Sequence, residues 1–280
     1  MKHKTAIIIH SCDRYSLLFK GFDYFFKRYW DFNIPCTCYF ATEEVDVDYV
    51  DFRNIKSGRG EWTNRLVNLL DQIEEEYVLY FQEDMWLNKP INKVFFTKLF
   101  DLAIKNNWQQ IKLNSSNVSK TEETPFFVEG FNIAKLINNE SGYLMSHQVT
   151  LWRKDFLRNQ LKPNEHPWRN ERKGTKRLRQ LNPEIYHVDY FAENGMPPHN
   201  RNTNPIGRSE YHSISENAAL KDNVLPFLDI LKSAEGYSEY YQHLMYNYQN
   251  KLTHDGKAKP LKRNMLERLK TWFKKKLTSI

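Results

Sequence analysis

The sequence lacks the long apolar runs of membrane proteins and secretory signals. No segment approaches the roughly 20 apolar residues that a membrane-spanning helix needs. The mean hydropathy of -0.72 likewise argues against an integral membrane protein. Near the N-terminus, the apolar stretch from Ala6 to Ile9 is shorter than the ~7–15 apolar residues of a signal peptide. We therefore expect a cytoplasmic protein in which residues 4–9 form a buried strand.

Cysteine is also scarce, and its pattern gives no disulfide framework. Cys12, Cys36 and Cys38 are odd in number and contain no Cys-x-x-Cys spacing. Cys36 and Cys38 would lie on the same face of a strand, which is poor geometry for a bridge between them. A reduced compartment with structural thiols explains this pattern better than a zinc site does.

Several catalytic motifs are absent. The chain has no G-x-x-x-x-G-K-[ST], no G-x-S-x-G and no H-E-x-x-H. These absences exclude P-loop NTPases, α/β-hydrolases and zincin metalloproteases. Residues 10–16, which follow the first expected strand, contain no glycine, whereas a nucleotidyltransferase would normally carry a glycine-rich phosphate loop there. A nucleotidyltransferase with a related acidic metal site remains the alternative enzyme class.

Expected strands and helices alternate from the start of the chain. Strands are predicted at residues 4–9, 35–41, 76–81 and 110–113, and helices at 16–30, 63–75 (with Thr63 as N-cap) and 90–106. This alternation indicates parallel pairing in a doubly wound α/β sheet. Ligands of such sheets bind beyond the carboxyl ends of the strands. The segments 10–13 and 82–84 are expected at that edge.

The second half of the chain has a less regular pattern. We expect an irregular excursion or small β element at 115–139, a strand at 143–152, a helix at 154–161, a basic stretch at 169–179, a loop at 189–208 and a helical region at 223–250. The predicted organisation is one catalytic domain over residues 1–255 and a tail over 256–280. Residues 1–114 would bind the nucleotide, and residues 115–255 would face the acceptor.

The strongest local signal is YVLYFQEDMWL at residues 77–87. Here a strand carries two adjacent carboxylates, Glu83 and Asp84, to the ligand-binding edge of the sheet. Oxygen ligands suit Mg²⁺ or Mn²⁺, which also bind diphosphate oxygens. Such a cation would neutralise the charge that develops on a departing nucleoside diphosphate. A solvated acidic turn is the structural alternative.

Three segments together resemble a known family. They are IIIHSCDRYSLLFKGFDYFFKRYW, GEWTNRLVNLLDQIEEEYVLYFQEDMWL and YLMSHQVTLWRKDFLRNQLKPNEHPWRNE. In this order they resemble bacterial GT-A-like glycosyltransferases from capsule and surface-polysaccharide clusters, over about the first 175 residues. The resemblance implies a mixed, mainly parallel sheet flanked by helices. The family's usual acidic motif is Asp-x-Asp or Glu-Asp-Asp, whereas this chain has Gln82-Glu83-Asp84-Met85, in which Asp84 matches the last acid and Glu83 is the second ligand.

The resemblance assigns donor-binding residues in the first half. It implies that Ser11 and Asp13 lie against the nucleoside and that Trp62 and Arg65 lie near the base or the phosphates of the donor. Chemistry agrees for Arg65, because a guanidinium near a helix start can contact phosphate. An ordinary surface arginine is the alternative. Glu83 is also expected beside the nucleotide.

Acceptor-side residues are expected in the second half. His147, Gln148 and Trp168 would face the sugars, whereas core packing is the better explanation for Trp152. The segment Pro167-Trp168-Arg169-Asn170-Glu171 resembles the Trp-x-x-Glu/Asp segment that supplies the catalytic base of inverting transferases. Glu171 is the candidate base, which must reach the acceptor hydroxyl to take its proton. A surface ion pair with Arg169, Arg172 or Lys173 is the competing explanation.

Nine histidines are scattered along the chain. His187, Asp189 and His199 suggest a downstream metal ligand, but no spacing selects one of them. Structural roles are the better explanation for these histidines.

The net charge of +7 favours anionic partners. From Leu261 to Ile280, apolar residues fall on one helical side and basic residues fill most of the remainder, which is typical of a helix that binds an anionic membrane surface. Packing of this helix on the domain is the alternative. The high pI of about 9.1 also raises the possibility of a nucleic-acid-binding protein, but the chain contains no recognisable nucleic-acid module, so no nucleic-acid partner is expected.

The sequence therefore predicts a glycosyltransferase that uses a nucleotide-sugar co-substrate and a Mn²⁺ or Mg²⁺ cofactor. It would transfer a sugar, with inversion, to a hydroxyl of a surface polysaccharide or a lipid-linked oligosaccharide. The expected location is the cytoplasm, peripheral on the inner face of the plasma membrane.

Overall fold

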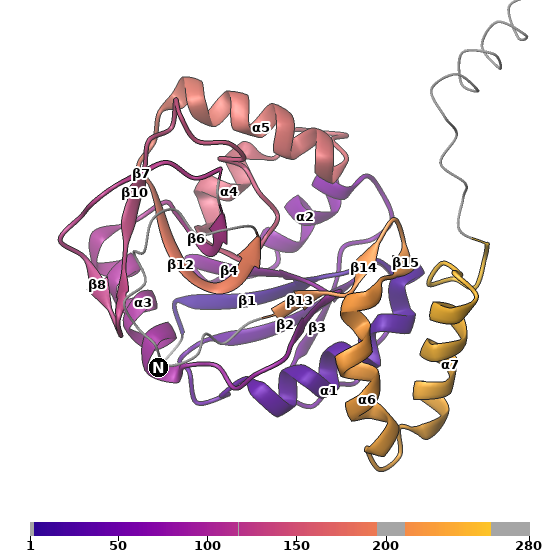
Figure 1. Ribbon diagram of the computed structural model, residues 1–280. Helices are drawn as coiled ribbons and strands as arrows, with labels where there is room; N and C mark the ends of the chain where they lie inside the picture. Colours follow the sequence, from indigo (N-terminus) through magenta and orange to yellow (C-terminus); the bar gives the residue numbers. More distant parts are fainter. Residues whose placement is uncertain (1–2, 117, 195–210, 259–280) are drawn as a thin grey trace, which may run out of the picture.

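The centre of the protein is a nine-stranded sheet with the order β3-β2-β1-β4-β11-β6-β12-β10-β7 (Figure 1). The computed structural model describes residues 3–116, 118–194 and 211–258. In the sheet, β11 and β10 run opposite to the other strands. The strands are β1 (Thr5–His10), β2 (Thr37–Thr42), β3 (Arg53–Lys56), β4 (Tyr77–Gln82), β6 (Gln110–Ser116), β7 (Thr121–Glu122), β10 (Ala134–Leu136), β11 (Thr150–Arg153) and β12 (Ile185–Asn194).

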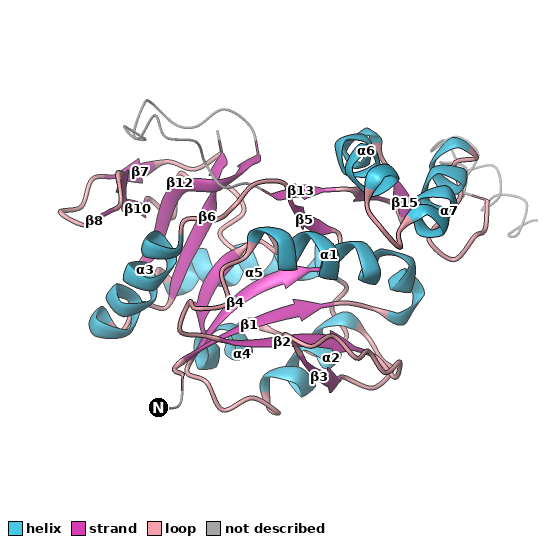
Figure 2. Cartoon of the chain, turned by 90° about the horizontal axis from the view of Figure 1, so that it is seen from below, coloured by secondary structure: helices cyan, strands magenta, loops and turns pink. Residues whose placement is uncertain are grey.

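Helices cover both faces of this sheet (Figure 2). Apolar side chains of α1 and α3 form a core on one face, and those of α2, α4 and α5 form a second core on the other. The helices are α1 (Phe19–Tyr29), α2 (Trp62–Leu70), α3 (Lys93–Asn106), α4 (Lys154–Gln160), α5 (Pro167–Leu181), α6 (Leu225–Ser233) and α7 (Ser238–Gln249), with short 3-10 helices η1 (Asp13–Leu18) and η2 (Asp222–Val224).

Strand β4 explains how one apolar run serves both cores. Tyr77, Leu79 and Phe81 lie in the first core, and Val78 and Tyr80 lie in the second. Successive side chains of a strand point to opposite faces, so a strand that is covered on both sides needs apolar residues at every position. The strand then ends where polar residues begin, at the edge of the sheet.

Three two-stranded pairs supplement the sheet. One of them, β5 with β13, and the neighbouring hairpin of β14 and β15 bring residues 211–220 close to the end of β4. The pairs are β5 (Met85–Leu87) with β13 (Tyr211–Ser213), β14 (Ser215–Glu216) with β15 (Ala219–Leu220), and β8 (Phe127–Val128) with β9 (Phe131–Asn132). Helix α6 packs on α1, with 4.8 Å between the ring centroids of Phe227 and Phe25.

The predicted fold class, a mixed and mainly parallel sheet flanked by helices, is confirmed. Parallel pairing holds among β3, β2, β1 and β4, with helices between β1 and β2 and between β3 and β4 but none between β2 and β3. It fails at β11, which pairs antiparallel with both β4 and β6. The expected small β element at 115–139 corresponds to β7, β8, β9 and β10.

The prediction of Thr63 as an N-cap is wrong. Helix α2 begins at Trp62, and the N-cap position belongs to Glu61. The Thr63 hydroxyl oxygen instead accepts the backbone N–H of Glu165, with 3.0 Å between the two atoms. The helix also ends at Leu70 rather than at residue 75.

The expected strand over 143–152 is confined to β11, at Thr150–Arg153. Side chains take up the backbone groups that a strand would have paired. Lys112 Nζ donates to the carbonyl of Tyr143, and Gln110 Nε2 donates to that of Leu144. Because these side chains of β6 satisfy the backbone carbonyls of Tyr143 and Leu144, the segment before β11 can follow an irregular path without strand pairing.

The structure extends one further expectation and corrects part of another. The basic stretch at 169–179 lies within a full helix, α5, in which Pro167 occupies the first turn. The expected loop at 189–208 begins as strand, because β12 continues to Asn194, and residues 195–208 lie outside the described residues. Tyr190 and Phe191 are buried in the first core, which explains why this polar-flanked segment pairs in the sheet.

The helical region predicted at 223–250 is two antiparallel-packed elements, α6 and α7. The break falls at Gly236, whose φ of +75° is a conformation that other residues rarely adopt. No helix in the described part of the chain combines the length and the apolar character needed to cross a bilayer.

Candidate functional site

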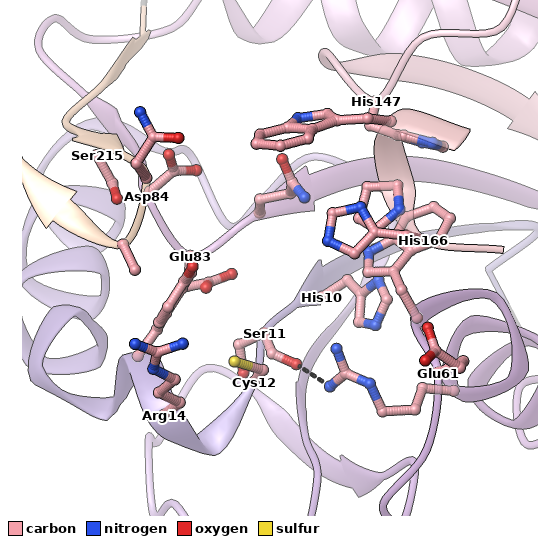
Figure 3. Close-up of a pocket in the computed structure, with 18 of the residues that line it drawn as sticks. His10, Ser11, Cys12, Arg14, Glu61, Glu83, Asp84, His147, His166 and Ser215 are labelled. Carbon is pink, nitrogen blue, oxygen red and sulfur yellow. Dashed lines mark hydrogen bonds between the residues drawn. The ribbon is translucent and has the colours of Figure 1, made fainter. Parts of the chain in front are cut away.

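A cavity of about 700 Å³ opens at the carboxyl ends of β1 and β4 (Figure 3). These parallel strands are neighbours, but the chain continues from β1 to β2 and β3 on one side before it returns to β4 on the other. Such a reversal leaves a crevice where open α/β sheets bind their ligands. The residues that line it are His10, Ser11, Cys12, Arg14, Tyr15, Gly60, Glu61, Trp62, Arg65, Gln82, Glu83, Asp84, His147, Gln148, His166, Pro167, Trp168, Glu171, Ser215, Glu216, Asn217 and Ala218.

The acidic pair lies directly after β4. The carbonyl of Glu83 accepts a hydrogen bond from the buried indole of Trp86, at 3.1 Å. Asp84 Oδ2 accepts one from the Ser213 hydroxyl of β13, at 2.8 Å. Thus Trp86 of the core holds Glu83, and Ser213 of β13 holds Asp84. In Figure 3 both lie on the same side of the pocket.

Burial raises the pKa of both carboxyl groups. For Glu83, which is only 5% exposed, the pKa rises well above its ordinary value, first through burial and then through the negative charge of Asp84. For Asp84, burial raises the pKa, while the Ser213 hydrogen bond opposes the rise. Two crowded carboxylates of this kind gain from a bound cation, because the cation offsets both their desolvation and their repulsion.

The donor set fits a cation that is shared with a ligand. Within the ranges that the structure describes, no three His, Cys, Asp or Glu side chains gather into a closed metal cage. Mg²⁺ in particular is often held by one or two carboxylates together with substrate phosphates and water. Glu83 and Asp84 supply that number of carboxylates at the wall of an open pocket.

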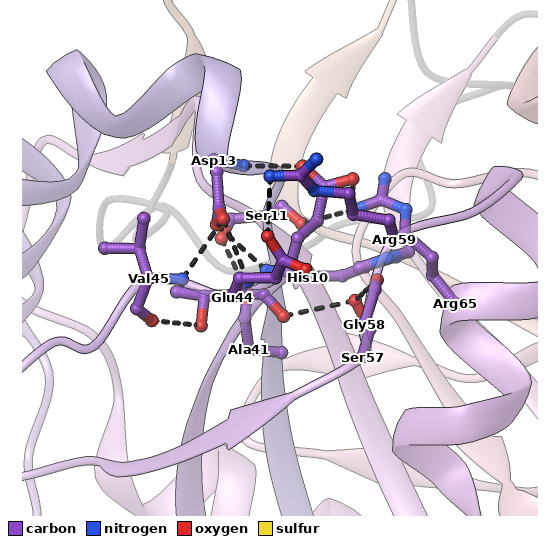
Figure 4. A network of polar contacts seen from close by, with 12 residues as sticks. His10, Ser11, Asp13, Ala41, Glu44, Val45, Ser57, Gly58, Arg59 and Arg65 are labelled. Carbon is purple, nitrogen blue, oxygen red and sulfur yellow. Dashed lines mark hydrogen bonds and ion pairs between the residues drawn. The ribbon is translucent and has the colours of Figure 1, made fainter.

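Ser11 and Arg65 are buried and line the pocket, and Figure 4 shows them within a network of polar contacts. Arg65 Nη1 donates to the carbonyl of Ser11 at 3.0 Å and lies 3.3 Å from Glu43 Oε1. The Ser11 hydroxyl donates to the carbonyl of Ala41. The guanidinium is therefore already anchored, and it presents a fixed positive charge rather than a free side chain.

Asp13 does not line the cavity. Its carboxylate accepts backbone N–H groups of Glu43, Glu44 and Val45, and its own N–H donates to Glu43 Oε2 (Figure 4). Asp13 thus fixes the turn after β2. These hydrogen bonds give Asp13 a structural role that needs no contact with a nucleoside.

Aromatic rings and imidazoles also line the pocket. The Trp62 ring lies 4.2 Å from that of His147 and 5.4 Å from that of His10, measured between centroids. His10 Nδ1 is 3.1 Å from the Tyr80 hydroxyl. Burial lowers the pKa of His10 well below its ordinary range and that of His147 to about 3. Both imidazoles are therefore neutral at physiological pH.

Glu171, on the first turns of α5, faces the pocket. Its Oε1 accepts the backbone N–H of His147 at 2.9 Å, and burial raises its pKa. The positive charge of Lys112, a buried lysine whose own pKa burial lowers to about 8, opposes this rise. Among the described residues, Glu171 forms no ion pair within 4.0 Å, so the surface-pair explanation does not hold.

Two other acceptor-side candidates also line the cavity. Gln148 Oε1 accepts the hydroxyl of Tyr211 at 2.6 Å. Trp168 is 69% exposed, and its ring lies 5.4 Å from that of His166 at the pocket mouth. Trp152 is instead 1% exposed in the second core, which agrees with the packing role expected for it.

The structure brings nine of the ten predicted site residues to one cavity, and Asp13 is the exception. His10 and Gln82, the last residues of β1 and β4, also line the cavity; sequence analysis expected their segments at this edge but gave neither residue a role. It also missed Arg14, His166 and residues 215–218. Nothing local in the sequence marks the β14–β15 hairpin, which reaches the pocket only through its pairing and packing.

The other metal candidates lie away from this cavity. His187 is buried on β12, with 2.7 Å between its Nε2 and the carbonyl oxygen of Asn114, and its Nδ1 lies 3.7 Å from Asp189 Oδ1. His199 lies outside the described residues. The cysteines are free thiols, and burial raises the pKa of Cys12 to about 12.

No protein-family model matches the sequence, and no curated protein does. Among solved structures, residues 1–349 of S. aureus TarS are 11% identical, with a TM-score of 0.48, covering 95% of this chain and 77% of that one. The TarS complex with UDP-GlcNAc is 12% identical, with a TM-score of 0.44 and the same coverage. A CMP:2-keto-3-deoxy-manno-octonic acid synthetase complex with CTP is 13% identical, with a TM-score of 0.42, covering 66% of this chain and 88% of that one. Similarity at these scores carries no argument about activity.

Proposed function

We propose that the cavity binds a nucleotide-sugar donor and that the protein is a glycosyltransferase. The observation that carries this proposal is the placement of Glu83 and Asp84. They stand at the end of β4, beside the strand reversal, and open into a cavity of about 700 Å³. That volume lies within the ~300–1,000 Å³ of typical ligand pockets.

Glu83 and Asp84 would hold Mn²⁺ or Mg²⁺ together with the donor diphosphate. When bound, the cation supplies charge neutralisation for the departing nucleoside diphosphate. Asp84 is the better-presented ligand, because it is half-buried and its free carboxylate oxygen is not engaged by Ser213. Glu83 is more deeply buried and serves as the second ligand.

Most of the donor side of the site comes from residues 1–114. Ser11 and Trp62 line the cavity beside the acidic pair, and Trp62 offers an aromatic surface to the nucleoside. The fixed guanidinium of Arg65 contributes positive charge on the same side. A preorganised cation binds a phosphate group without a further ordering of its own side chain.

The acceptor side comes from residues 115–255. Glu171 is positioned as the general base, and its raised pKa brings a carboxyl group closer to the pH at which a base works best. A base that deprotonates an acceptor hydroxyl for direct attack corresponds to transfer with inversion. His147, Gln148 and Trp168 would form the sugar-binding surface around it, with the exposed indole of Trp168 at the mouth.

A thermal-shift screen of nucleotide sugars and free nucleoside diphosphates tests the donor proposal. A ligand that binds only the native state adds RT ln(1 + [L]/Kd) to the free energy of unfolding. We expect a rise in Tm that requires Mn²⁺ or Mg²⁺ and disappears with EDTA. If no nucleotide changes Tm in either condition, the proposal is wrong.

The acceptor is proposed to be a hydroxyl of a surface polysaccharide or a lipid-linked oligosaccharide. The segment from Leu261 to Ile280 would then bring the enzyme to an anionic membrane surface. This segment lies outside the described residues, and its composition alone supports the proposal.

A further inference from the structure

A turn near the end of the described chain reaches the wall of the cavity. His254 is 6% exposed, and its Nε2 lies 2.7 Å from the Ser215 hydroxyl oxygen. The backbone N–H of His254 donates to the carbonyl of Ala218 at 2.8 Å, and the Tyr15 ring packs edge-on at 4.9 Å. The imidazole is thus fixed behind the β14–β15 hairpin, which lines the pocket.

The tautomer of His254 decides what the Ser215 hydroxyl does. His254 Nδ1 is buried and has no hydrogen-bond partner among the residues that the structure describes. If Nδ1 carried the proton, a buried N–H donor would be left without an acceptor. Orphaned buried N–H groups are rarer in proteins than acceptors with a free lone pair. The proton therefore belongs on Nε2, which then donates to Ser215 Oγ.

The ring carries a single proton. Burial, together with the positive charge of Arg14, lowers the pKa of His254 to about 4. At neutral pH the imidazole consequently has one N–H, and its position follows from the geometry above.

With its oxygen accepting from His254, the Ser215 hydroxyl has its own proton free. Ser215 lines the cavity, and Figure 3 shows it beside Asp84. Ser213 ties the two together, because its hydroxyl contacts both Asp84 Oδ2, at 2.8 Å, and the Ser215 carbonyl, at 3.3 Å. The hydroxyl is thus a donor next to the acidic pair.

The turn that carries His254 also fixes the guanidinium of Arg14, on the other side of the Glu83–Asp84 pair. Arg14 lines the cavity, and Asp255, the neighbour of His254, binds its guanidinium at 3.3 and 3.4 Å. Figure 3 shows Arg14 close to Glu83. A hydroxyl donor and a guanidinium around a cation site match the oxygens of a diphosphate better than a neutral sugar.

We propose that the Ser215 hydroxyl donates a hydrogen bond to a diphosphate oxygen of the bound donor and that His254 is the positioning residue that directs it. This assignment rests on the proposed function of the cavity. It makes the His254 turn part of the donor site, although 241 residues separate Asp255 from Arg14.

The tautomer can be measured without any ligand. Long-range ¹H–¹⁵N spectra of protein labelled at the histidine ring nitrogens distinguish protonated from unprotonated nitrogen, and the His254→Gln variant identifies the signals. We expect Nε2 to be protonated and Nδ1 to be unprotonated. Protonated Nδ1 would overturn the proposal.

Calorimetric titration with UDP and other nucleoside diphosphates, in Mn²⁺, tests the hydrogen bond. Ser215→Ala should weaken binding about tenfold or more, as expected for a hydrogen bond to a charged group, and should leave the affinity for the free nucleoside unchanged. His254→Gln, whose amide can still donate to Ser215, should keep most of the affinity, whereas His254→Leu should approach Ser215→Ala. Ser233→Ala, the same change at an exposed position of α6 away from the cavity, is the matched control.

Equal diphosphate affinity of Ser215→Ala and the intact chain overturns the proposal, as does a loss of the same size in nucleoside affinity. If the intact chain binds no nucleotide at all, the proposed function fails, and the assigned ligand fails with it. The tautomer result still stands in that case, so the two failures remain distinguishable.

Discussion

Glu171 and His147 are joined by a hydrogen bond between a side chain and the backbone, with 2.9 Å between Glu171 Oε1 and the His147 nitrogen. The bond links α5 to the irregular segment before β11, and both elements line the cavity. It uses one carboxylate oxygen and leaves the other available. Since burial raises the pKa of the group, Glu171 combines a fixed position with an increased basicity.

Glu171→Gln should lower kcat much more than it raises KM for the donor. The amide can still accept the His147 N–H, so the geometry survives while the proton acceptor is lost. A general base contributes about 10²–10⁴-fold, and a loss of this size in kcat is expected. Steady-state kinetics decide the matter, with Glu140→Gln on the exposed surface as control. Unchanged kcat would assign the base elsewhere, with His147 the next residue of the cavity to test.

Asp84→Asn should remove activity and the metal-dependent part of donor binding. The substitution keeps the size of the side chain and its bond to Ser213 but removes the charge that a cation requires. Glu83→Gln should be milder if Asp84 is the principal ligand. Activity assays and Tm shifts with and without Mn²⁺ compare the two variants, and circular dichroism checks that the fold is intact. Full activity of Asp84→Asn contradicts the metal site.

Glu83→Gln should also change how stability depends on pH. In the folded protein, burial and Asp84 raise the pKa of Glu83 well above its ordinary 4.5. A group with a raised folded-state pKa contributes stability that is fully present below the unfolded-state value, and this contribution is lost as pH rises through the folded-state pKa. In EDTA, the variant should therefore gain stability relative to the intact chain as pH rises.

Urea unfolding at a series of pH values between about 4 and 8 measures this difference. Because the two proteins share every other titrating group, their difference reports Glu83 together with its charge coupling to Asp84. Added Mn²⁺ should reverse the gain, since a bound cation stabilises the ionised carboxylate of the intact chain. A difference in the free energy of unfolding that stays constant with pH would show that burial does not raise the pKa of Glu83.

Removal of residues 261–280 should release the protein from anionic vesicles while transfer to a soluble acceptor persists. The basic residues of this segment, among them Lys274, Lys275 and Lys276, would each contribute about 1 kcal/mol near an anionic surface. Vesicle co-sedimentation of intact and truncated chains measures the effect. Raised salt should weaken the binding of the intact chain, and neutral vesicles are the control. Equal sedimentation of both chains refutes the membrane proposal.

The first four parallel strands illustrate what the sequence could predict. β1, β2 and β4 are local apolar runs, and the sequence predicts each of them within one or two residues of its bounds, whereas β3 (RNIK) is not apolar and is not predicted. Once their parallel order was inferred, the polar residues at their ends had to meet at one edge. This is why Ser11, Glu83 and Asp84 were found by the same argument.

The Ser215 side of the site could not be found in this way. Its place depends on the antiparallel pairing of β13 with β5 and on the turn that carries His254. Neither contact has a local signature, because the residues are far apart in the sequence. Asp13 shows the converse: its position in the sequence suggested a ligand contact, but three backbone N–H groups of a neighbouring turn use its carboxylate.

Gly21→Ala should destabilise the protein by about 1–3 kcal/mol, as overpacking of a well-packed core typically does. Gly21 lies within α1, where alanine would ordinarily be more favourable than glycine by ~1 kcal/mol. Here, however, an added Cβ would lie only 2.2 Å from Trp86 Cη2 and 2.3 Å from Cζ2. The fully buried indole cannot yield without moving its neighbours, so the steric cost should exceed the gain in helix propensity.

The same substitution should weaken metal-dependent donor binding, because the Trp86 indole donates to the Glu83 carbonyl. Displacement of the Trp86 ring would therefore move the backbone of Glu83, and with it the Glu83 and Asp84 carboxylates. Urea unfolding measures the first effect, and nucleotide titration in Mn²⁺ measures the second. Lys20→Ala, next to it on the exposed side of α1, is the control. If Gly21→Ala is as stable as the intact chain or more so, the packing of Trp86 against α1 does not hold the acidic pair in place.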